Sequence, residues 1–407
     1  MKKGNIVVFS LILFSLTFIL ASCSTKTSNK GYVREDVNSY GKVAWQEEVE
    51  FKVDIEGTLY NVQEFSSVYD AIEQAISEGG GTVYFPPGTY SIDKPIELDL
   101  PKGVNLTLMG EPNAHSILKG ERTVEGPVIS IQSKGVSLAN LVLQSYSNDH
   151  PALLVKGDGT RVYKCWFQGM NLRNEESTVI IAASDVVVAS CNFSNVHPEA
   201  YTLEITKYPD KEVKKVYVVD FFLNGEFNGF VVTSDDENGY PEDVLIQRGV
   251  FLNYSKEQLT IKSVKNLTVD NNMLDQSALY CITLSPIHNG IDNVVIKENY
   301  IAAAYGLGQT ENATAIYVDG TNDSKASNVL IKNNMIAYSM LGVHITGGNF
   351  VDSEIRDNVF QSTQSFGLKI EEAKGLSISR NSFKPDNGSI GLEIESQDEN
   401  TVVENNF

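Results

Sequence analysis

A short motif recurs through most of the chain and restricts the folds that the chain can adopt. Val294-x-Ile296-x-x-Asn299-x-Ile301 has close copies at 329–336, 355–360, 376–383 and 402–407. Apolar and polar residues alternate within each copy, which is the period of a β-strand. The copies extend upstream at intervals of 23 to 35 residues, a spacing typical of a solenoid. The position of the motif's Asn is occupied by Leu141, Cys165, Cys191, Phe221, Gly249, Asn272, Asn299, Asn334, Asn358, Asn381 and Asn405, here named the Asn column.

A second element precedes each copy and completes the repeating unit. It reads Gly-φ-x-φ-x, with φ an apolar residue, at 342–346, 367–371 and 391–395. Each coil then holds three short strands, which bury a core only by stacking on their neighbours. At about 4.8 Å per coil, roughly eleven or twelve coils form a rod roughly 55 Å long. The sequence thus predicts one all-β domain, although 407 residues would suggest two or three domains by length alone.

The Asn column has a structural explanation. Asn tolerates left-handed backbone, and stacked Asn amides bond to one another. Cys165 and Cys191 are adjacent members of the column. We expect stacked thiols there, since a disulfide needs Cβ atoms near 3.8 Å, closer than the stacking repeat.

The N-terminus has the order of a signal peptide. Lys2 and Lys3 precede an apolar run at 6–20, which is short for a membrane span. Leu20-Ala21-Ser22-Cys23 resembles the lipobox of bacterial lipoproteins. The resemblance implies a signal at 1–22, a lipid on Cys23, a polar tether at 23–31 and attachment to a membrane surface. An ordinary secretory signal is the alternative.

A further resemblance covers most of the chain. Residues 67–76 form an amphipathic helix pattern, and Glu78-Gly-Gly-Gly-Thr-Val-Tyr-Phe-Pro-Pro-Gly-Thr-Tyr90 follows. This stretch is similar to the N-terminal motif of polygalacturonase-related and tailspike-like proteins of the pectate lyase superfamily. The resemblance implies a single-stranded right-handed parallel β-helix over 62–407, with the helix capping one end of the core. Residues 32–61 fit no coil and are expected to be an accessory segment, with a hairpin around Gly57.

Active sites in this superfamily lie on the outer face of the first strand of each coil. Alternation predicts two outward columns on that face. One contains Glu204, Val231, Thr260, Thr283, Tyr317, His344, Lys369 and Glu393; the other contains Thr206, Thr233, Lys262, Ser285, Asp319, Thr346, Glu371 and Glu395. Neighbours in a column are about 4.8 Å apart, so we expect Tyr317, Asp319, His344, Lys369 and Glu371 to form one patch.

Loop lengths point to the same patch. The longest interval between copies, 35 residues, belongs to the coil of Tyr317 and Asp319. Its extra residues lie at 302–313 and 320–328, and two long loops would make the strand the floor of a groove. Tyr305 in the first loop could stack on a sugar ring.

The patch offers several reactions. A His or Lys base with a Tyr acid suits elimination or C5 epimerisation of a uronic acid. Asp319 and Glu371 could instead hydrolyse a glycosidic bond, with inversion as the easier geometry for carboxylates two coils apart. The alternative is that these polar side chains are simply solvated.

Comparison with enzymes of the superfamily that the chain resembles narrows the possible reactions. Polygalacturonases have a paired Asp before a first strand and a Gly-His-Gly motif, whereas Asp235-Asp236 follows its strand and His288 lies in Ile-His-Asn-Gly. Typical pectate lyases use Ca²⁺, which Asp235 and Asp236 could bind through oxygen atoms. Lys262 and His288 are further candidates for contact with substrate.

Charge and surface pattern limit the partners. A formal charge of −20 argues against nucleic-acid binding and slightly favours a glycan of low charge; nothing indicates a nucleotide or redox cofactor. An outward apolar stripe on the second strands suggests cover by a loop, by residues 31–61 or by another subunit, which leaves a homo-oligomer open. The stripe contains Val187, Tyr217, Leu245, Val295 and Leu330. We therefore expect a surface-anchored protein that binds and cleaves or modifies a polysaccharide, with non-catalytic adhesion or a structural envelope role as alternatives.

Overall fold

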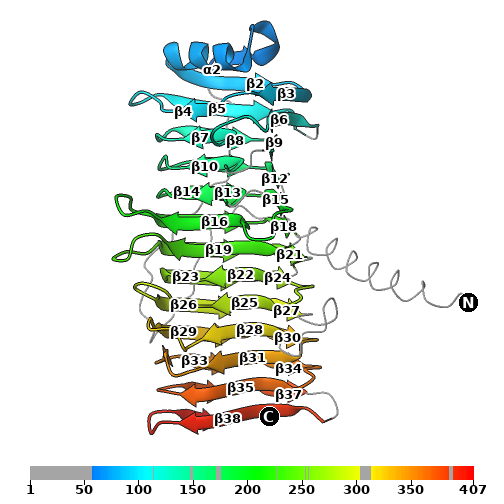
Figure 1. The fold of residues 1–407 in the computed structure, drawn as a ribbon, viewed down its shortest axis with the longest axis vertical. Helices are drawn as coiled ribbons and strands as arrows, with labels where there is room; N and C mark the ends of the chain where they lie inside the picture. The colour runs from blue at the N-terminus through cyan, green and yellow to red at the C-terminus, as the bar shows by residue number, and fades with distance from the viewer. Residues whose placement is uncertain are drawn as a thin grey trace, which may run out of the picture. The chain divides into compact units, whose positions relative to one another are not determined.

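The chain folds as a parallel β-helix. The computed structural model describes residues 57–112, 114–146, 150–170, 176–225, 227–252, 254, 256–302, 313–384 and 388–407. Three parallel sheets run along the solenoid, one for each strand of a coil, and two of them have 12 strands. The coils stack in chain order from the helix α2 to strand β38 (Figure 1). The predicted fold class and the three strands per coil are confirmed.

Sheet C contains the first strand of each coil. In spatial order its strands are β4 (Ile96–Leu98), β7 (Ile129–Ile131), β10 (Leu153–Val155), β13 (Val179–Ile181), β16 (Tyr201–Lys207), β19 (Asn228–Ser234), β22 (Glu257–Ile261), β25 (Tyr280–Leu284), β28 (Thr314–Asp319), β31 (Leu341–Thr346), β35 (Phe366–Ala373) and β38 (Ile390–Gln397).

Sheet A contains the second strands. It runs through β1 (Leu59–Asn61), β2 (Gly80–Phe85), β5 (Asn105–Gly110), β8 (Val136–Ala139), β11 (Arg161–Tyr163), β14 (Val186–Ala189), β17 (Lys214–Val219), β20 (Glu242–Gln247), β23 (Val264–Asp270), β26 (Ile291–Lys297), β29 (Ala326–Lys332), β33 (Glu354–Arg356), β36 (Ser377–Ser379) and β39 (Val402–Glu404), with β32 (Phe350–Val351) beside β29.

Sheet B contains the third strands. It runs through β3 (Gly88–Ile92), β6 (Ser116–Gly120), β9 (Leu141–Ser145), β12 (Trp166–Gly169), β15 (Asn192–Asn195), β18 (Phe222–Asn224), β21 (Val250–Leu252), β24 (Met273–Leu274), β27 (Tyr300–Ala302), β30 (Met335–Ala337), β34 (Val359–Gln361) and β37 (Ser382–Lys384).

One helical segment caps the first coil. The helix α2 (Val68–Ser77) begins where the Ser67 hydroxyl accepts a hydrogen bond from the amide of Asp70, at 3.1 Å. It buries Ala71, Ile72 and Ala75 against the end of the core, as the apolar spacing predicted. A short 3₁₀ turn, η2 (Val62–Glu64), precedes it. Among the described residues, no helix is both long and apolar enough to span a membrane.

The solenoid begins slightly earlier than residue 62. Leu59–Asn61 pairs in parallel with Thr82–Tyr84 of β2 and so belongs to sheet A. The part of the expected hairpin before Gly57 lies outside the described residues. The accessory role of residues 32–61 therefore stays a prediction.

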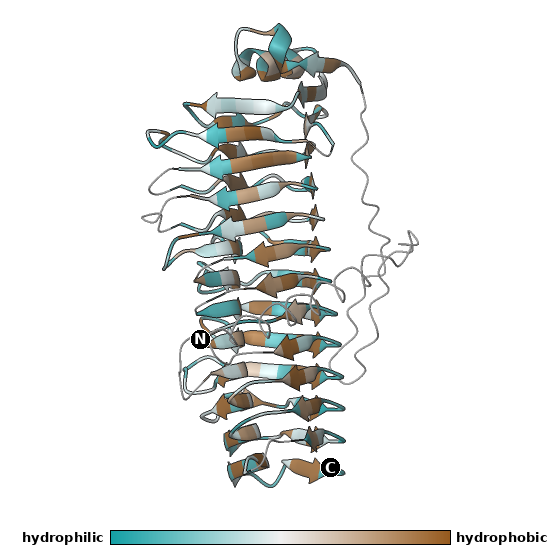
Figure 2. Cartoon of the chain, turned by 90° about the vertical axis from the view of Figure 1, so that its right-hand side faces the viewer, coloured by the Kyte–Doolittle hydropathy of each residue, from teal (hydrophilic) through white to brown (hydrophobic). Residues whose placement is uncertain are grey.

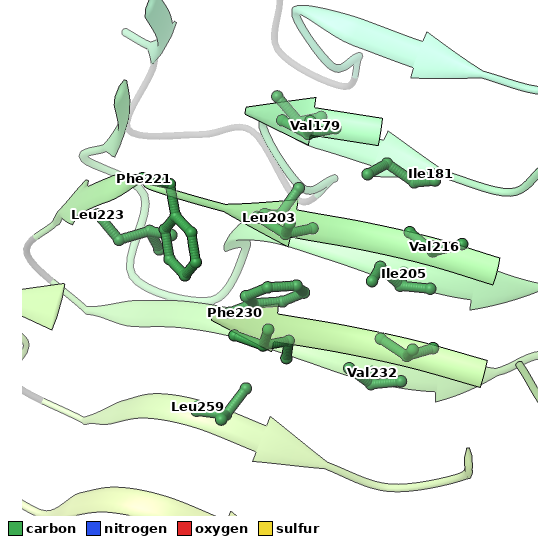
Figure 3. Packing of buried hydrophobic residues seen from close by; sticks show 14 of the residues in the cluster. Val179, Ile181, Leu203, Ile205, Val216, Phe221, Leu223, Phe230, Val232 and Leu259 are labelled. Atoms are coloured by element: carbon green, nitrogen blue, oxygen red, sulfur yellow. The ribbon is translucent and has the colours of Figure 1, made fainter. Parts of the chain in front are cut away.

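The inward side chains of the three sheets form one continuous core. Leu203, Ile205, Val216, Phe230 and Val232 are all fully buried, and Figure 3 shows them meeting between the strands. Hydrophobic residues concentrate on the strands, and hydrophilic ones are frequent at the turns (Figure 2). This division fixes which residues face outward, because a register shift by one residue would expose the core.

The Asn column forms a buried ladder, but its final member differs from the prediction. From Asn299 to Asn381, the amide oxygen of each Asn accepts hydrogen bonds from the backbone and side-chain amides of the Asn in the previous coil. The oxygen of Asn272, where the ladder begins, accepts from the Gly249 amide. The last rung is Asn406, whose Oδ1 accepts two hydrogen bonds from Asn381, and the assignment to Asn405 was wrong by one residue.

The left-handed backbone also lies one residue before the ladder. The positive φ angles belong to residues such as Glu298 (55°), Asn333 (53°) and Arg380 (54°). The ladder Asn residues are therefore selected for amide stacking, and the preceding residue makes the sharp turn.

Cys165 and Cys191 are buried free thiols. The amide of Cys165 donates to the Cys191 sulfur at 3.4 Å, which confirms stacking without a disulfide.

The apolar stripe on sheet A is not exposed. Its members Val187, Tyr217, Leu245, Val295 and Leu330 are between 2% and 8% exposed in the single chain. The predicted cover of this stripe is therefore present within the single chain, and the stripe gives no reason to invoke a second subunit. Oligomerisation stays a prediction.

Candidate functional site

The strand register brings the predicted patch together. Thr283 pairs with Tyr317, Tyr317 with His344, and His344 with Lys369. Lys369 pairs in turn with Glu393, and Asp319 pairs with Thr346. Both outward columns of sheet C therefore follow the predicted order over β28, β31, β35 and β38.

Two tyrosines stack at the centre of this face. The rings of Tyr280 and Tyr317 have centroids 4.5 Å apart and planes inclined by 10°. The His344 ring approaches Tyr317 from the next coil, with centroids 5.9 Å apart and an interplanar angle of 61°. The sequence pattern did not predict Tyr280 as part of this face, because Tyr280 begins its strand outside the regular alternation. Both tyrosines are only partly buried, so they offer an aromatic surface to a ligand.

His344 and Glu371 form a polar pair beside the tyrosines. Their Nε2 and Oε1 atoms are 3.3 Å apart, and the His344 side chain is 17% exposed. Burial lowers the pKa of His344, an effect that exceeds the opposing attraction of Glu371. A neutral imidazole that donates Nε2–H to Glu371 keeps a lone pair on Nδ1, and such a group can accept a proton.

Asp319 is hydrogen-bonded within the turn that follows its strand. Its Oδ1 accepts from the amide (3.1 Å) and hydroxyl (2.6 Å) of Thr321, and Oδ2 accepts from Asn322 Nδ2 (3.1 Å). Asn322 Nδ2 also donates to Ser285 Oγ at 3.3 Å. These bonds hold the turn after β28 against the solenoid and engage both oxygens of Asp319. The catalytic role of Asp319 stays a prediction.

The remaining patch residues are partly engaged or outside the described chain. Lys369 Nζ lies 3.1 Å from Glu395 Oε1 and 5.6 Å from the centre of the Phe366 ring. Tyr305 and Cys23 lie outside the described residues, as does most of the loop at 302–313. The first wall of the expected groove, sugar stacking by Tyr305 and lipid attachment to Cys23 therefore stay predictions.

A second polar cluster lies on the same face around Glu204. This carboxylate accepts a 2.6 Å hydrogen bond from Ser177 Oγ. Burial raises the pKa of Glu204, Asp235 adds to the rise, and Lys262 opposes it. Lys262 Nζ lies 5.4 Å from the ring centre of Tyr201. Glu204 was visible in the predicted column but carried no motif that would have marked it.

The turn with Asp235 and Asp236 does not fit a calcium site. Asp236 binds Lys207 Nζ through Oδ2 and accepts the Asn238 amide through Oδ1 at 2.9 Å. A lysine on the carboxylate occupies the place that a cation would need. Over the described ranges, no group of three or more His, Cys, Asp and Glu side chains is placed to hold a metal ion. His288 lies exposed in the neighbouring turn.

Comparisons with known proteins support the fold. The family described as "Rhamnogalacturonase A/epimerase, pectate lyase-like" matches residues 66–148, which include α2 and the first coils. The curated proteins include no match to this chain.

Three solved structures show how widely the fold is used. The catalytic unit of a GH87 α-1,3-glucanase from Streptomyces thermodiastaticus has 15% identity over 87% of this chain and 72% of its own, with TM-score 0.57. The A-module of the Azotobacter vinelandii mannuronan C-5 epimerase AlgE4 has 13% identity over 85% and 100%, with TM-score 0.51. The Streptococcus pneumoniae surface protein and adhesin PfbA has 14% identity over 86% and 99%, with TM-score 0.50.

These likenesses establish the parallel β-helix and no single activity. The three proteins are a hydrolase, an epimerase and an adhesin by their names, as expected for a fold that carries different sites.

Proposed function

We propose that this chain binds a polysaccharide across the outward face of sheet C and modifies it there by proton transfer. The observation that carries the proposal is the juxtaposition of the stacked Tyr280–Tyr317 rings with the His344–Glu371 pair. An aromatic surface suits a sugar ring, and a neutral histidine held by a carboxylate suits a general base.

The geometry favours a base–acid reaction over hydrolysis by two carboxylates. His344 is placed to take a proton from a sugar carbon while Glu371 stabilises the imidazolium that results. The Tyr317 ring lies against His344, and its hydroxyl, 3.4 Å from Thr346 Oγ1, is the group proposed to return a proton to the sugar. Elimination or epimerisation of a uronic acid fits these groups, whereas Asp319, tied to Thr321 and Asn322, is not available as a second carboxylate.

A polysaccharide panel tests the proposal. The purified protein is incubated with acidic and neutral polysaccharides while unsaturated uronides are followed by ultraviolet absorbance and new chain ends by a reducing-sugar assay. His344→Gln should abolish turnover and retain binding, and Tyr317→Ala should weaken binding. His115→Gln is the matched control, because His115 lies outside sheet C, just before β6 of sheet B, with its ring beside Trp166. Reducing ends without absorbance would reject elimination, and binding without any turnover would leave the adhesin function.

We further propose that the protein is exported and held at a membrane surface through Cys23. The order of charged, apolar and small residues before Cys23 supports this. Expression of the full chain in a bacterium, followed by detergent phase partitioning, should place it in the detergent phase. Cys23→Ala should move it to the aqueous phase; partitioning that does not depend on Cys23 would reject lipid attachment.

A further inference from the structure

Unequal turns create a hollow at the corner between sheets C and A. The turns at 208–213, 235–241 and 285–290 are long, whereas only Lys262 and Ser263 connect β22 to β23. A hollow of about 460 Å³ lies among these turns, within the size range of small-molecule sites. None of the residues that line it belongs to the Tyr317 patch.

The charges in the hollow are already balanced. Lys207 binds Asp236, and Lys214 lies 3.5 Å from Glu212 and 3.6 Å from Glu242. The Lys207 and Asp236 side chains are only 15% and 14% exposed. Both lysines that line the hollow are neutralised locally, so an anionic ligand would find no unpaired cation among the lining residues and would meet the protein's net negative charge.

The remaining lining suits hydroxyl groups and an apolar ring face. Asn238 and Asn289 present amides that donate and accept hydrogen bonds. Tyr240 provides an aromatic ring, whose centre lies 6.0 Å from Lys265 Nζ. Polar groups that both donate and accept, with one aromatic surface, are the chemistry that recognises a sugar.

Gly239 keeps the hollow in shape. A Cβ at this position would lie 2.5 Å from Lys207 Cε and 2.6 Å from Asp236 Oδ2. A side chain at residue 239 would therefore displace the Lys207–Asp236 pair that the turn passes over.

We infer that this hollow is a binding site for an uncharged sugar, at the margin of the face proposed to bind the polysaccharide. This inference rests on the proposed function for its biological setting, but the site is separate from the Tyr317 patch. The inference predicts that the polysaccharide contains an uncharged sugar, whichever reaction occurs at His344.

Binding of simple probes tests the inference. Methyl glycosides of glucose, galactose and mannose, and galacturonic acid as the charged counterpart, are titrated into the full chain by calorimetry and by saturation-transfer NMR. At least one neutral glycoside should bind, and galacturonic acid should bind more weakly. Tyr240→Ala should weaken the neutral ligand about five- to tenfold, the value expected for loss of one ring contact.

Matched variants separate the outcomes. Tyr163→Ala removes another surface tyrosine that has a lysine over its ring, and it should leave binding unchanged. Asn289 lies in an exposed turn, so Asn289→Ala should weaken binding without affecting the fold. The inference fails if no neutral glycoside binds, if galacturonic acid binds as well, or if Tyr240→Ala and Asn289→Ala both have no effect. Loss of polysaccharide turnover in His344→Gln would still support the proposed function in each of these cases.

Discussion

Replacement of Asn334 by alanine should cause a large loss of stability at the centre of the ladder. Asn334 Oδ1 accepts from the amide and side chain of Asn299, both at 3.0 Å. Its Nδ2 donates to Ile296 O at 2.9 Å and to Asn358 Oδ1 at 3.0 Å. At about 1 kcal/mol net for each hydrogen bond, the loss of these contacts should lower the free energy of unfolding by about 4 kcal/mol. The side chain is 1% exposed, so water cannot readily replace them.

The terminal rung gives the matched control. Asn406 makes similar bonds to Asn381 and Ile378 but is only partly buried. Water can restore its partners, so Asn406→Ala should lower the free energy by only about 1 kcal/mol. Urea unfolding measures both variants, and hydrogen exchange should show lost protection in the coils of β27, β30 and β34 for Asn334→Ala. Equal effects of the two substitutions, or an Asn334→Ala loss under about 1 kcal/mol, would show that amide stacking does not stabilise this solenoid.

Three further predictions follow from buried groups. Burial raises the pKa of Glu204, beside Ser177, Asp235, Lys262 and Glu176, so the folded state holds this proton more tightly than the unfolded state does. Its contribution to stability is complete below the ordinary glutamate pKa and falls as pH rises through the folded value. Glu204→Gln should therefore match the parent protein in thermal unfolding near pH 4 and exceed it near pH 7; a constant difference would contradict this. Cys165, Cys191 and Cys281 are buried free thiols, and peptide mapping should find them unlabelled by maleimide until the protein unfolds; labelling in the native state would refute their placement. A Cβ at Gly249 would lie 2.1 Å from the Phe221 ring, so Gly249→Ala should destabilise by about 1–3 kcal/mol in urea unfolding. Phe221→Leu in the same chain should recover part of that loss, and no recovery would mean that another contact limits residue 249.

The sequence predicted the outward columns because strand alternation leaves little freedom. Once Val343 and Ile345 face the core, His344 must face outward, and stacking then places it between Tyr317 and Lys369. The same logic failed at two positions where the repeat is irregular. The last copy admits Asn405 or Asn406 as the rung, and only the three-dimensional register decides between them. Tyr280 begins its strand outside the alternating pattern, so its stacking on Tyr317 could not be read from spacing.

Contacts between side chains were less predictable than their positions. Asp319 lies where the column placed it, but Thr321 and Asn322 occupy its oxygen atoms. The hollow beside Tyr240 depends on the difference between neighbouring turns. A sequence read one coil at a time shows each turn's length but not the space that three turns enclose. The sequence predicted that the sheet A stripe would be covered, but the alternation does not encode which segment covers it.

The corner between sheets C and A has a consequence for how such proteins diversify. The core residues on either side of a turn are fixed by their stacking partners, whereas the turn at 235–241 contributes no residue to the core cluster. Insertions and deletions can therefore reshape the sugar-sized hollow while every inward side chain stays the same. Two homologues with identical cores could then select different glycans, and their specificity would follow turn length more closely than overall identity. Exchanging this one turn between homologues is accordingly a practical route to altered specificity without redesign of the scaffold.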